Sequence, residues 1–224
     1  MSETLADRWR GVQERVADAC RDAGRSPDEV TTIVVTKFHP AALVRQLHAL
    51  GVRHVGENRH QDAAPKQLEV ADLDLTWHFV GQLQSNKARA VASYCDVIHS
   101  VDRVSLVDAL AKYDGSVDVF LEVNLTSVPG RGGVEPSDLM ALAESTVAAE
   151  NLRLRGLMAV APQDESPADA FDRVLEYREE LLRVAPWATE LSLGMSGDFV
   201  EAIARGATHL RIGTAITGKR PEGT

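Results

Sequence analysis

The sequence predicts an α/β protein that forms a single TIM-like (β/α)8 barrel with an extra N-terminal helix. Eight short runs rich in β-branched residues alternate with longer segments of helical periodicity, and one further helical segment precedes the first run. Strands that alternate with helices in this way form parallel sheets, and eight such units favour a closed barrel over an open doubly wound sheet. No linker or low-complexity segment divides residues 1–224, so we expect one domain.

The first predicted element is a helix, because Leu5, Trp9, Val12, Val16 and Cys20 recur at helical spacing before Gly24. The predicted strands span residues 31–37, 54–58, 76–81, 97–101, 118–124, 154–160, 190–195 and 209–214. The helices expected between these strands span residues 40–50, 85–94, 103–113, 136–149 and 198–205. A further helix ends near residue 70, and another begins with the Ser166 cap and Pro167.

The amino-acid composition and net charge limit which kinds of molecule the protein can bind. The chain has 224 residues, is 44% hydrophobic and carries a formal charge of −9, which suits one globular domain with a substantial core. A net acidic surface disfavours non-specific binding to nucleic acid, which needs a basic footprint. It does not exclude a small anionic ligand, because a pocket can be locally positive on an acidic protein.

The cysteines and the N-terminus indicate a cytoplasmic location. Cys20 and Cys95 lie in apolar periodic stretches without metal-type spacing, so we interpret both as reduced core thiols. The first ten residues lack the apolar core of a signal peptide, and no apolar run approaches the roughly 20 residues of a membrane span. We therefore expect a soluble protein with no membrane partner.

Lys37 is the strongest candidate for covalent chemistry. Functional groups of such barrels collect where strands end, and Lys37 ends the first predicted strand after the apolar run Ile33-Val34-Val35. We expect this position to desolvate the ammonium group and lower the pKa of Lys37. A neutral amine can attack an aldehyde and form a Schiff base. The alternative is a lysine at a strand end whose ammonium group stays in solvent.

Two loops at the same end of the predicted barrel form a candidate anion site. Ser196 and Gly197 lie where the seventh strand turns into a helix, and Gly213 and Thr214 follow the eighth strand. Barrel phosphate sites are often built from these two loops, with backbone N–H groups as donors. An ordinary helix cap and an ordinary glycine turn are the alternatives, and the Asp198 carboxylate would repel a phosphate unless it points away.

Three other polar residues are less decisive. Arg211 alternates with Leu210 and Ile212, so it faces the barrel mouth or forms a salt bridge. Asn58 ends the second strand, and His78 in the third strand is either a core histidine or a site residue. His39 and His78 have no third ligand at a spacing that suggests a metal site, and no Ser-His-Asp order, P-loop or GxGxxG indicates other chemistry.

Taken in order, these segments resemble the pyridoxal phosphate homeostasis proteins, which are similar to the N-terminal barrel of alanine racemase. The resemblance covers nearly the whole chain. The stretches that carry it are Val35-Thr36-Lys37, Gly56-Glu57-Asn58-Arg59, Trp77-His78-Phe79-Val80-Gly81, Leu83-Gln84-Ser85-Asn86-Lys87, His99-Ser100-Val101-Asp102, Val123-Asn124, Arg155-Gly156-Leu157-Met158, Leu193-Gly194-Met195-Ser196 and Arg211-Ile212-Gly213-Thr214-Ala215-Ile216.

The resemblance implies a cofactor, pyridoxal 5′-phosphate (PLP, a form of vitamin B6), held as a Schiff base on Lys37. It also implies phosphate contacts from Ser196, Gly197, Gly213 and Thr214, a ring-side contact from Asn58, and Arg211 near the pyridine nitrogen. Because an arginine donates and does not readily lose its proton, it would keep this nitrogen unprotonated and weaken the ring as an electron sink. That favours holding the cofactor over carbanion chemistry.

The sequence departs from the family pattern at three positions. Gln82 stands where proline is common, Arg131 lies where a lysine is common, and Thr217 stands where an aromatic residue is usual. Arginine cannot form a Schiff base, so a role for a second lysine near Arg131 is not supported.

We therefore expect a non-catalytic carrier for PLP homeostasis, with apo PLP-dependent enzymes as recipients and a monomeric state. A racemase-like enzyme is the alternative. We expect no room after Thr214 for the second domain that completes a racemase site, and Tyr94, Tyr113 and Tyr177 all fall in predicted helices. A barrel that binds another phosphorylated metabolite is a third possibility.

Overall fold

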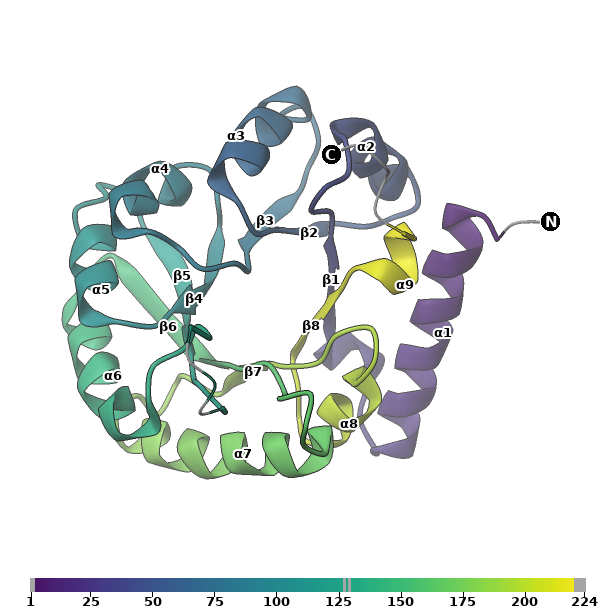
Figure 1. The fold of residues 1–224 in the computed structure, drawn as a ribbon. Coiled ribbons are helices and arrows are strands. Elements are labelled where there is room, and N and C mark those ends of the chain that lie inside the picture. Colours follow the sequence, from purple (N-terminus) through teal and green to yellow (C-terminus); the bar gives the residue numbers. More distant parts are fainter. Residues whose placement is uncertain (1–2, 127, 129, 220–224) are drawn as a thin grey trace.

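The computed structural model describes residues 3–126, 128 and 130–219, and it contains a closed parallel barrel. Each strand pairs with the next along the chain, and β1 pairs with β8 to close the ring (Figure 1). This confirms the predicted (β/α)8 barrel over the open sheet. The strands are β1 (Thr31–Val35), β2 (His54–Glu57), β3 (Thr76–Phe79), β4 (Val97–Val101), β5 (Val117–Glu122), β6 (Leu152–Met158), β7 (Glu190–Ser192) and β8 (His209–Ile212).

Helices surround the barrel on its outside (Figure 1). The α-helices are α1 (Leu5–Asp22), α2 (Ala41–Ala49), α3 (His60–Glu69), α4 (Ala88–Ala92), α5 (Val104–Leu110), α6 (Leu139–Ala148), α7 (Pro167–Val184), α8 (Phe199–Ala204) and α9 (Thr214–Thr217). Three short 3-10 segments are η1 (Pro27–Glu29), η2 (Ser85–Lys87) and η3 (Pro136–Asp138).

The extra N-terminal helix α1 forms as its sequence predicts. Thr4 and Asp7 make a reciprocal capping box at its start, and the apolar stripe is buried at Val12, Val16 and Cys20. The helix packs against α8 and α9, the last two helices of the described residues (Figure 1). Arg8 Nε donates a 2.7 Å hydrogen bond to the carbonyl oxygen of Ile216 in α9.

The predicted boundaries differ from the structure mainly at the ends of elements. The first strand stops at Val35 rather than residue 37, and the predicted helix over 85–94 is a 3-10 turn followed by the short helix α4. Ser166 occupies the N-cap of α7, but its hydroxyl makes no capping hydrogen bond. Helix α9 has no counterpart in the prediction, because its few residues show no helical periodicity.

The core has two parts. A large apolar layer fills the space between the strands and the outer helices, and it includes the unpaired cysteines Cys20 and Cys95. A second, separate apolar cluster contains Val97, Phe120 and Met158. TIM-barrel interiors are usually filled by branched apolar residues. Here the strands also bring polar side chains together across the barrel, from His54, His78, His99, Ser192, His209 and Arg211.

None of the helices in the described residues combines the length and the apolar character that crossing a bilayer requires.

Candidate functional site

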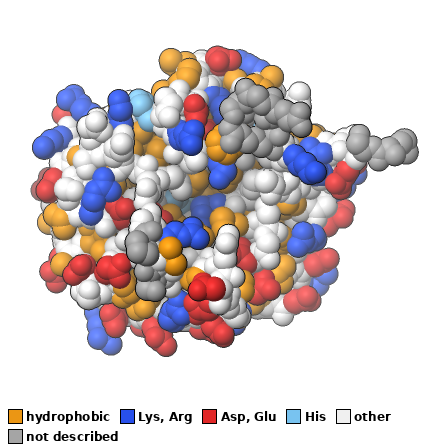
Figure 2. Space-filling view, viewed as in Figure 1, with side chains coloured by type: hydrophobic (Ala, Val, Ile, Leu, Met, Phe, Trp, Pro, Cys, Tyr) orange, Lys and Arg blue, Asp and Glu red, His pale blue; other side chains and the backbone are white. Residues whose placement is uncertain are grey.

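All seven residues predicted to contact a ligand line one cavity of about 440 Å³. The cavity lies beyond the carboxyl ends of β1, β2, β3, β7 and β8, where barrel enzymes place their sites. Its volume falls in the range of small-molecule sites. Figure 2 shows basic side chains around a hollow near the middle of this face. The lining residues are Val35, Lys37, Asn58, Val80, Gly81, Val160, Met195, Ser196, Gly197, Arg211, Gly213 and Thr214.

Lys37 reaches this cavity from the loop after β1. Its Nζ lies 5.8 Å from the centre of the Phe38 ring, and it is the only lysine among the described lining residues. The expectation that Lys37 is desolvated is wrong, because β1 ends two residues earlier and the side chain is exposed. Phe38 has a φ of 69°, a left-handed conformation that is strained for a residue with a side chain. Lys37 therefore stands at a sharp change in chain direction.

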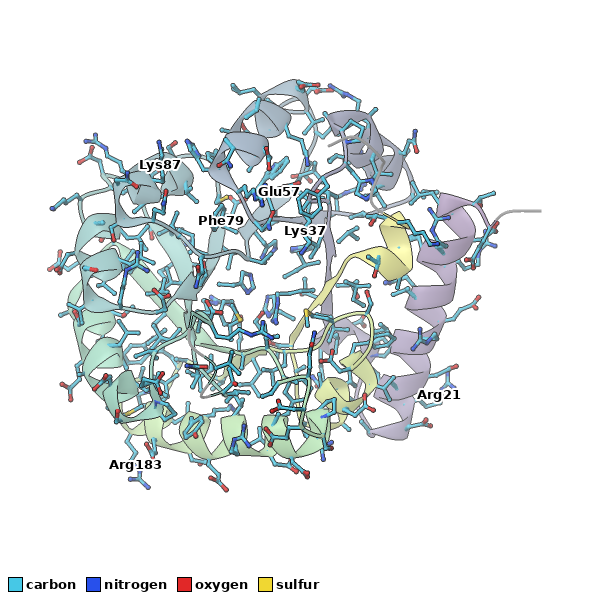
Figure 3. The ribbon with its side chains drawn as sticks, in the orientation of Figure 1. Arg21, Lys37, Glu57, Phe79, Lys87 and Arg183 are labelled. Carbon is cyan, nitrogen blue, oxygen red and sulfur yellow. The ribbon has the colours of Figure 1, made fainter. Side chains whose placement is uncertain are left out.

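A buried ion pair holds the backbone next to Lys37. Lys66 Nζ contacts Glu57 Oε1 and donates a 3.0 Å hydrogen bond to the carbonyl oxygen of Thr36. The Thr36 hydroxyl donates to the same Glu57 oxygen over 2.7 Å. Burial raises the pKa of Glu57, and Lys66 opposes that shift. Figure 3 shows Glu57 and Lys37 near each other at the edge of the barrel.

Lys66 was not among the residues predicted to form this region. A signal was present, because Lys66 lies three residues after Ala63 and four before Val70, on the apolar face of its helix. A lysine on such a face, 6% exposed here, needs a buried partner.

The two loops predicted to bind an anion lie side by side. The Ser196 hydroxyl accepts a 3.4 Å hydrogen bond from the Ala215 amide, which joins the loop after β7 to the start of α9. Within residues 3–126, 128 and 130–219, no protein acceptor is bonded to the amides of Ser196, Gly197, Gly213 and Thr214. Four unpaired amides at one cavity are the donors that an anion requires.

The geometry of the first loop depends on Gly194 and Asp198. Gly194 has a φ of 87°, and a Cβ at this position would lie 2.8 Å from the Ala202 Cβ, so the turn onto α8 requires glycine. Asp198 Oδ1 accepts a 2.6 Å hydrogen bond from the Met195 amide. Asp198 is not a lining residue. Its carboxylate is thus occupied by the backbone of its own loop.

Arg211 is a buried cation with uncharged partners. Its Nη1 donates to the carbonyl oxygen and, over 2.8 Å, to the hydroxyl of Ser192, and its Nη2 donates over 2.9 Å to the carbonyl oxygen of Ala159. Among the described residues it takes part in no salt bridge, so the salt-bridge alternative is wrong. Burial lowers the pKa of Arg211 to about 10, and Glu122 and Asp198 oppose this. It remains protonated at neutral pH.

Asn58 lines the cavity and carries a buried acceptor without a partner among the described residues. Its Oδ1 is buried and has no hydrogen-bond partner among the described residues. Gly81 packs directly against it, since a Cβ on Gly81 would lie 2.3 Å from the Asn58 carbonyl oxygen. An orphaned buried oxygen is costly unless a ligand or water supplies a donor.

The cavity is locally positive although the protein is acidic. Lys37 and Arg211 are the charged residues of its described lining, and no carboxylate is among them. Among acidic residues, Glu122 has the largest effect on the pKa of Arg211. Burial, followed by the charge of Asp102, raises the pKa of Glu122 to about 7. The arrangement suits a small anionic ligand with hydrogen-bonding groups.

Other residues singled out in the sequence lie elsewhere. His78 is a core residue, bonded to His54 and His99. In the described residues, no group of three or more His, Cys, Asp or Glu side chains is arranged to hold a metal ion. Arg131 lines a neighbouring cavity with Glu122, and the Thr217 hydroxyl donates to the carbonyl oxygen of Gly213.

Comparison with known proteins identifies the family. The family model described as alanine racemase, N-terminal domain, matches residues 14–221. The chain is 42% identical to the pyridoxal phosphate homeostasis protein of Pseudomonas aeruginosa, over 98% of this chain and 97% of that protein. It belongs to the pyridoxal phosphate homeostasis protein family. Another member, from Aquifex aeolicus, is 39% identical over 96% of this chain and 97% of that one. The resemblance seen in the sequence is confirmed.

Solved structures agree with membership of the pyridoxal phosphate homeostasis protein family. PipY of Synechococcus elongatus, solved without PLP, has a TM-score of 0.83 and 37% identity, covering 96% of this chain and 100% of PipY. PipY with PLP bound has a TM-score of 0.82 and covers the same fractions of the two chains. Alanine racemase of Corynebacterium glutamicum, at 16% identity, covers 95% of this chain and 62% of the racemase with a TM-score of 0.70, and it shows the fold alone.

Proposed function

We propose that this protein binds PLP in the cavity at the carboxyl ends of the strands, linked to Lys37 as a Schiff base. We further propose that it acts in intracellular PLP homeostasis and delivers the cofactor to apo-enzymes. The relatives named for PLP homeostasis support the homeostasis role, and the PLP-bound PipY supports PLP binding. The two unpaired, buried cysteines suit a reducing intracellular compartment.

One observation carries the proposal. An exposed lysine, four unpaired amides, an orphaned amide oxygen and a buried arginine all meet at a single cavity. Each of these groups suits one part of the cofactor. The Lys37 amine can react with an aldehyde, and the amides of Ser196, Gly197, Gly213 and Thr214 can donate hydrogen bonds to a phosphate. Asn58 Oδ1 can accept a hydrogen bond from a ring hydroxyl. The residues present therefore fit PLP.

Arg211 has donors left for the ring nitrogen. A guanidinium has five N–H groups, and the hydrogen bonds to Ser192 and Ala159 occupy three of them. A donor in this position occupies the lone pair of the pyridine nitrogen. PLP supplies an electron sink for reactions at amino acids, and a neutral ring nitrogen weakens that sink.

The same cavity disfavours a racemase. Racemisation needs acid and base groups on both faces of the substrate carbon. Lys37 is the only described lining residue that can act as a base, because Arg211 stays protonated and no tyrosine, histidine or cysteine lines the cavity. Measurement of racemisation of alanine and a panel of other amino acids decides between the two functions; sustained turnover would support the enzyme.

Reductive trapping tests the Lys37 link. Full-length protein is incubated with PLP, reduced with borohydride, digested and mapped by mass spectrometry, and the pyridoxyl group is expected on Lys37. Lys37→Ala should abolish the adduct without changing the fold, because the side chain is exposed. Lys87→Ala, at an exposed lysine of a neighbouring cavity, is the control and should label normally. An adduct on another lysine in Lys37→Ala would refute the assignment.

A further inference from the structure

A chain of hydrogen bonds crosses the barrel interior from Arg211 to the opposite end. Arg211 Nη1 contacts Ser192 Oγ at 2.8 Å, and Ser192 Oγ contacts His99 Nδ1 at 2.8 Å. His99 Nε2 lies 2.8 Å from His78 Nδ1, and His78 Nε2 lies 3.0 Å from His54 Nδ1. The chain thus begins at the cavity and ends at His54, the half-buried first residue of β2.

Arg211 fixes the direction of every bond in this chain. A guanidinium only donates, so Ser192 Oγ accepts from it. The hydroxyl hydrogen of Ser192 then satisfies His99 Nδ1, which leaves the proton of a neutral His99 on Nε2. His99 therefore donates to His78 Nδ1, and His78 Nε2–H donates to His54 in turn. The reverse direction would leave the Ser192 hydroxyl hydrogen without an acceptor among the described residues.

This direction stabilises a buried cation. The serine hydroxyl and each imidazole direct a lone pair, the electron-rich side of their dipole, toward Arg211. Hydrogen bonds aligned in this way polarise one another in a low dielectric. The histidines remain uncharged at neutral pH, since burial holds the pKa of His78 and of His99 well below 6.5. Among the described residues no carboxylate pairs with Arg211, so neutral dipoles take that role.

We propose that Ser192, His99, His78 and His54 are positioning residues for Arg211. They hold one edge of its guanidinium against β7 and leave the remaining N–H groups directed to the cavity. The ligand at those N–H groups is the ring nitrogen only if the proposed function holds. The imidazoles therefore act on the site through Arg211, and none of them lines the cavity.

The first test needs no cofactor. Full-length protein with ¹⁵N-labelled histidine, without added PLP, is studied by NMR at neutral pH. His78 and His99 are both expected as the Nε2–H tautomer, and Ser192→Ala should remove the hydrogen bond at His99 Nδ1. An Nδ1–H tautomer or an imidazolium at either ring would overturn the assigned direction. The tautomers can be determined even if PLP fails to bind. A failure to bind PLP would contradict the proposed function but not the assigned direction of the hydrogen bonds.

The second test uses PLP itself. His99→Phe removes both hydrogen bonds but keeps a ring that can stack on Phe120, whose centre lies 4.6 Å from that of His99. It should weaken PLP binding roughly 5- to 10-fold and shift the absorption of bound PLP. His209→Phe is the matched control. His209 lies in the same barrel interior, but its hydrogen bond is to Thr208, which is not part of the hydrogen-bond chain from Arg211 to His54.

The outcomes separate positioning from simple packing. Loss of affinity with a spectral shift in His99→Phe, but not in His209→Phe, supports the proposal. Equal behaviour of the two variants overturns it. If His99→Phe fails to fold, Ser192→Ala answers the same question with a smaller change, and unaltered PLP affinity and absorption in that variant would also overturn the proposal.

Discussion

The carbonyl oxygen of Thr36 accepts a 3.0 Å hydrogen bond from the buried ammonium group of Lys66. Lys66 is itself paired with Glu57, so the backbone preceding Lys37 is fixed by residues outside the cavity. The side chain of Lys37 is exposed, but its backbone is thus held in place through the neighbouring residue Thr36.

Lys66→Met should strongly destabilise the protein. The substitution leaves Glu57 as an unpaired buried charge and frees the Thr36 carbonyl, and removal of one partner of a buried pair costs about 3–5 kcal/mol. Chemical denaturation at neutral pH measures the change in free energy of unfolding. The control is Arg89→Met, which breaks the exposed pair with Asp114 and should cost less than about 1 kcal/mol. Similar losses in the two variants would contradict this account.

Gly81→Ala should displace Asn58. The new Cβ would lie 2.3 Å from the Asn58 carbonyl oxygen, a backbone atom, so the chain must shift at a cost of about 1–3 kcal/mol. Thermal melting and PLP titration should both show a loss. Gly11→Ala in α1 is the control, since nothing lies within 4 Å of its Cβ and the helix should gain about 0.5–1 kcal/mol. Unchanged PLP affinity in Gly81→Ala would count against the role of Asn58.

Arg211→Ala should alter the bound cofactor. Loss of the guanidinium removes the donor proposed for the ring nitrogen. It also leaves the Ala159 carbonyl oxygen without its donor, whereas the Ser192 carbonyl oxygen keeps the Ala159 amide. Weaker PLP binding and a changed absorption spectrum are expected, with a loss of stability of about 1–3 kcal/mol. Arg173→Ala, which also removes a donor to a backbone carbonyl, should lower stability but leave the spectrum intact. An unchanged spectrum and affinity in Arg211→Ala would refute the contact.

His209 should make the protein less stable in acid. Burial, with the charges of His54, Arg155 and Arg211, lowers the pKa of His209 from 6.5 to about 4. Between these values the unfolded chain binds a proton that the folded chain does not, so stability falls as pH drops from 6.5 to 4 and this contribution is then constant. Glu122 acts with the opposite sign, because its raised pKa makes stability fall as pH rises from 4.5 to about 7.

The comparison with His209→Asn isolates the histidine. Between pH 7 and pH 5 the wild type should lose roughly 2 kcal/mol more of its unfolding free energy than the variant. Urea denaturation at the two pH values measures this, and Glu122 cancels because both proteins contain it. Parallel pH profiles would show that His209 is not the group responsible.

The barrel was predictable because its signals are local. Each strand contains β-branched residues and each helix an apolar period, and the order of the elements sets the parallel topology. The seven cavity residues were predictable because parallel strands bring their carboxyl ends to one edge. The exposure of Lys37 was not, since it depends on β1 ending at Val35 and on the left-handed Phe38.

The polar barrel interior could not be predicted from the sequence. His99 and Ser192 lie 93 positions apart, and only barrel closure brings their side chains within 2.8 Å. Alternation along a strand assigns a residue to one face but does not identify its partner across the barrel. The same holds for Lys66, which donates a hydrogen bond to the Thr36 carbonyl oxygen and forms its buried ion pair with Glu57 of β2.

The bond between Arg8 of α1 and Ile216 of α9 has a consequence for biosynthesis. The two residues are 208 positions apart, so at about 5–20 residues per second the ribosome needs about 10–40 s between them. During that interval α1 lacks its contacts with α8 and α9, and β1 has no β8 to close the ring. The β1 edge of the nascent sheet therefore stays unpaired until translation of the barrel is nearly complete, and this is the stage at which chaperones would matter most.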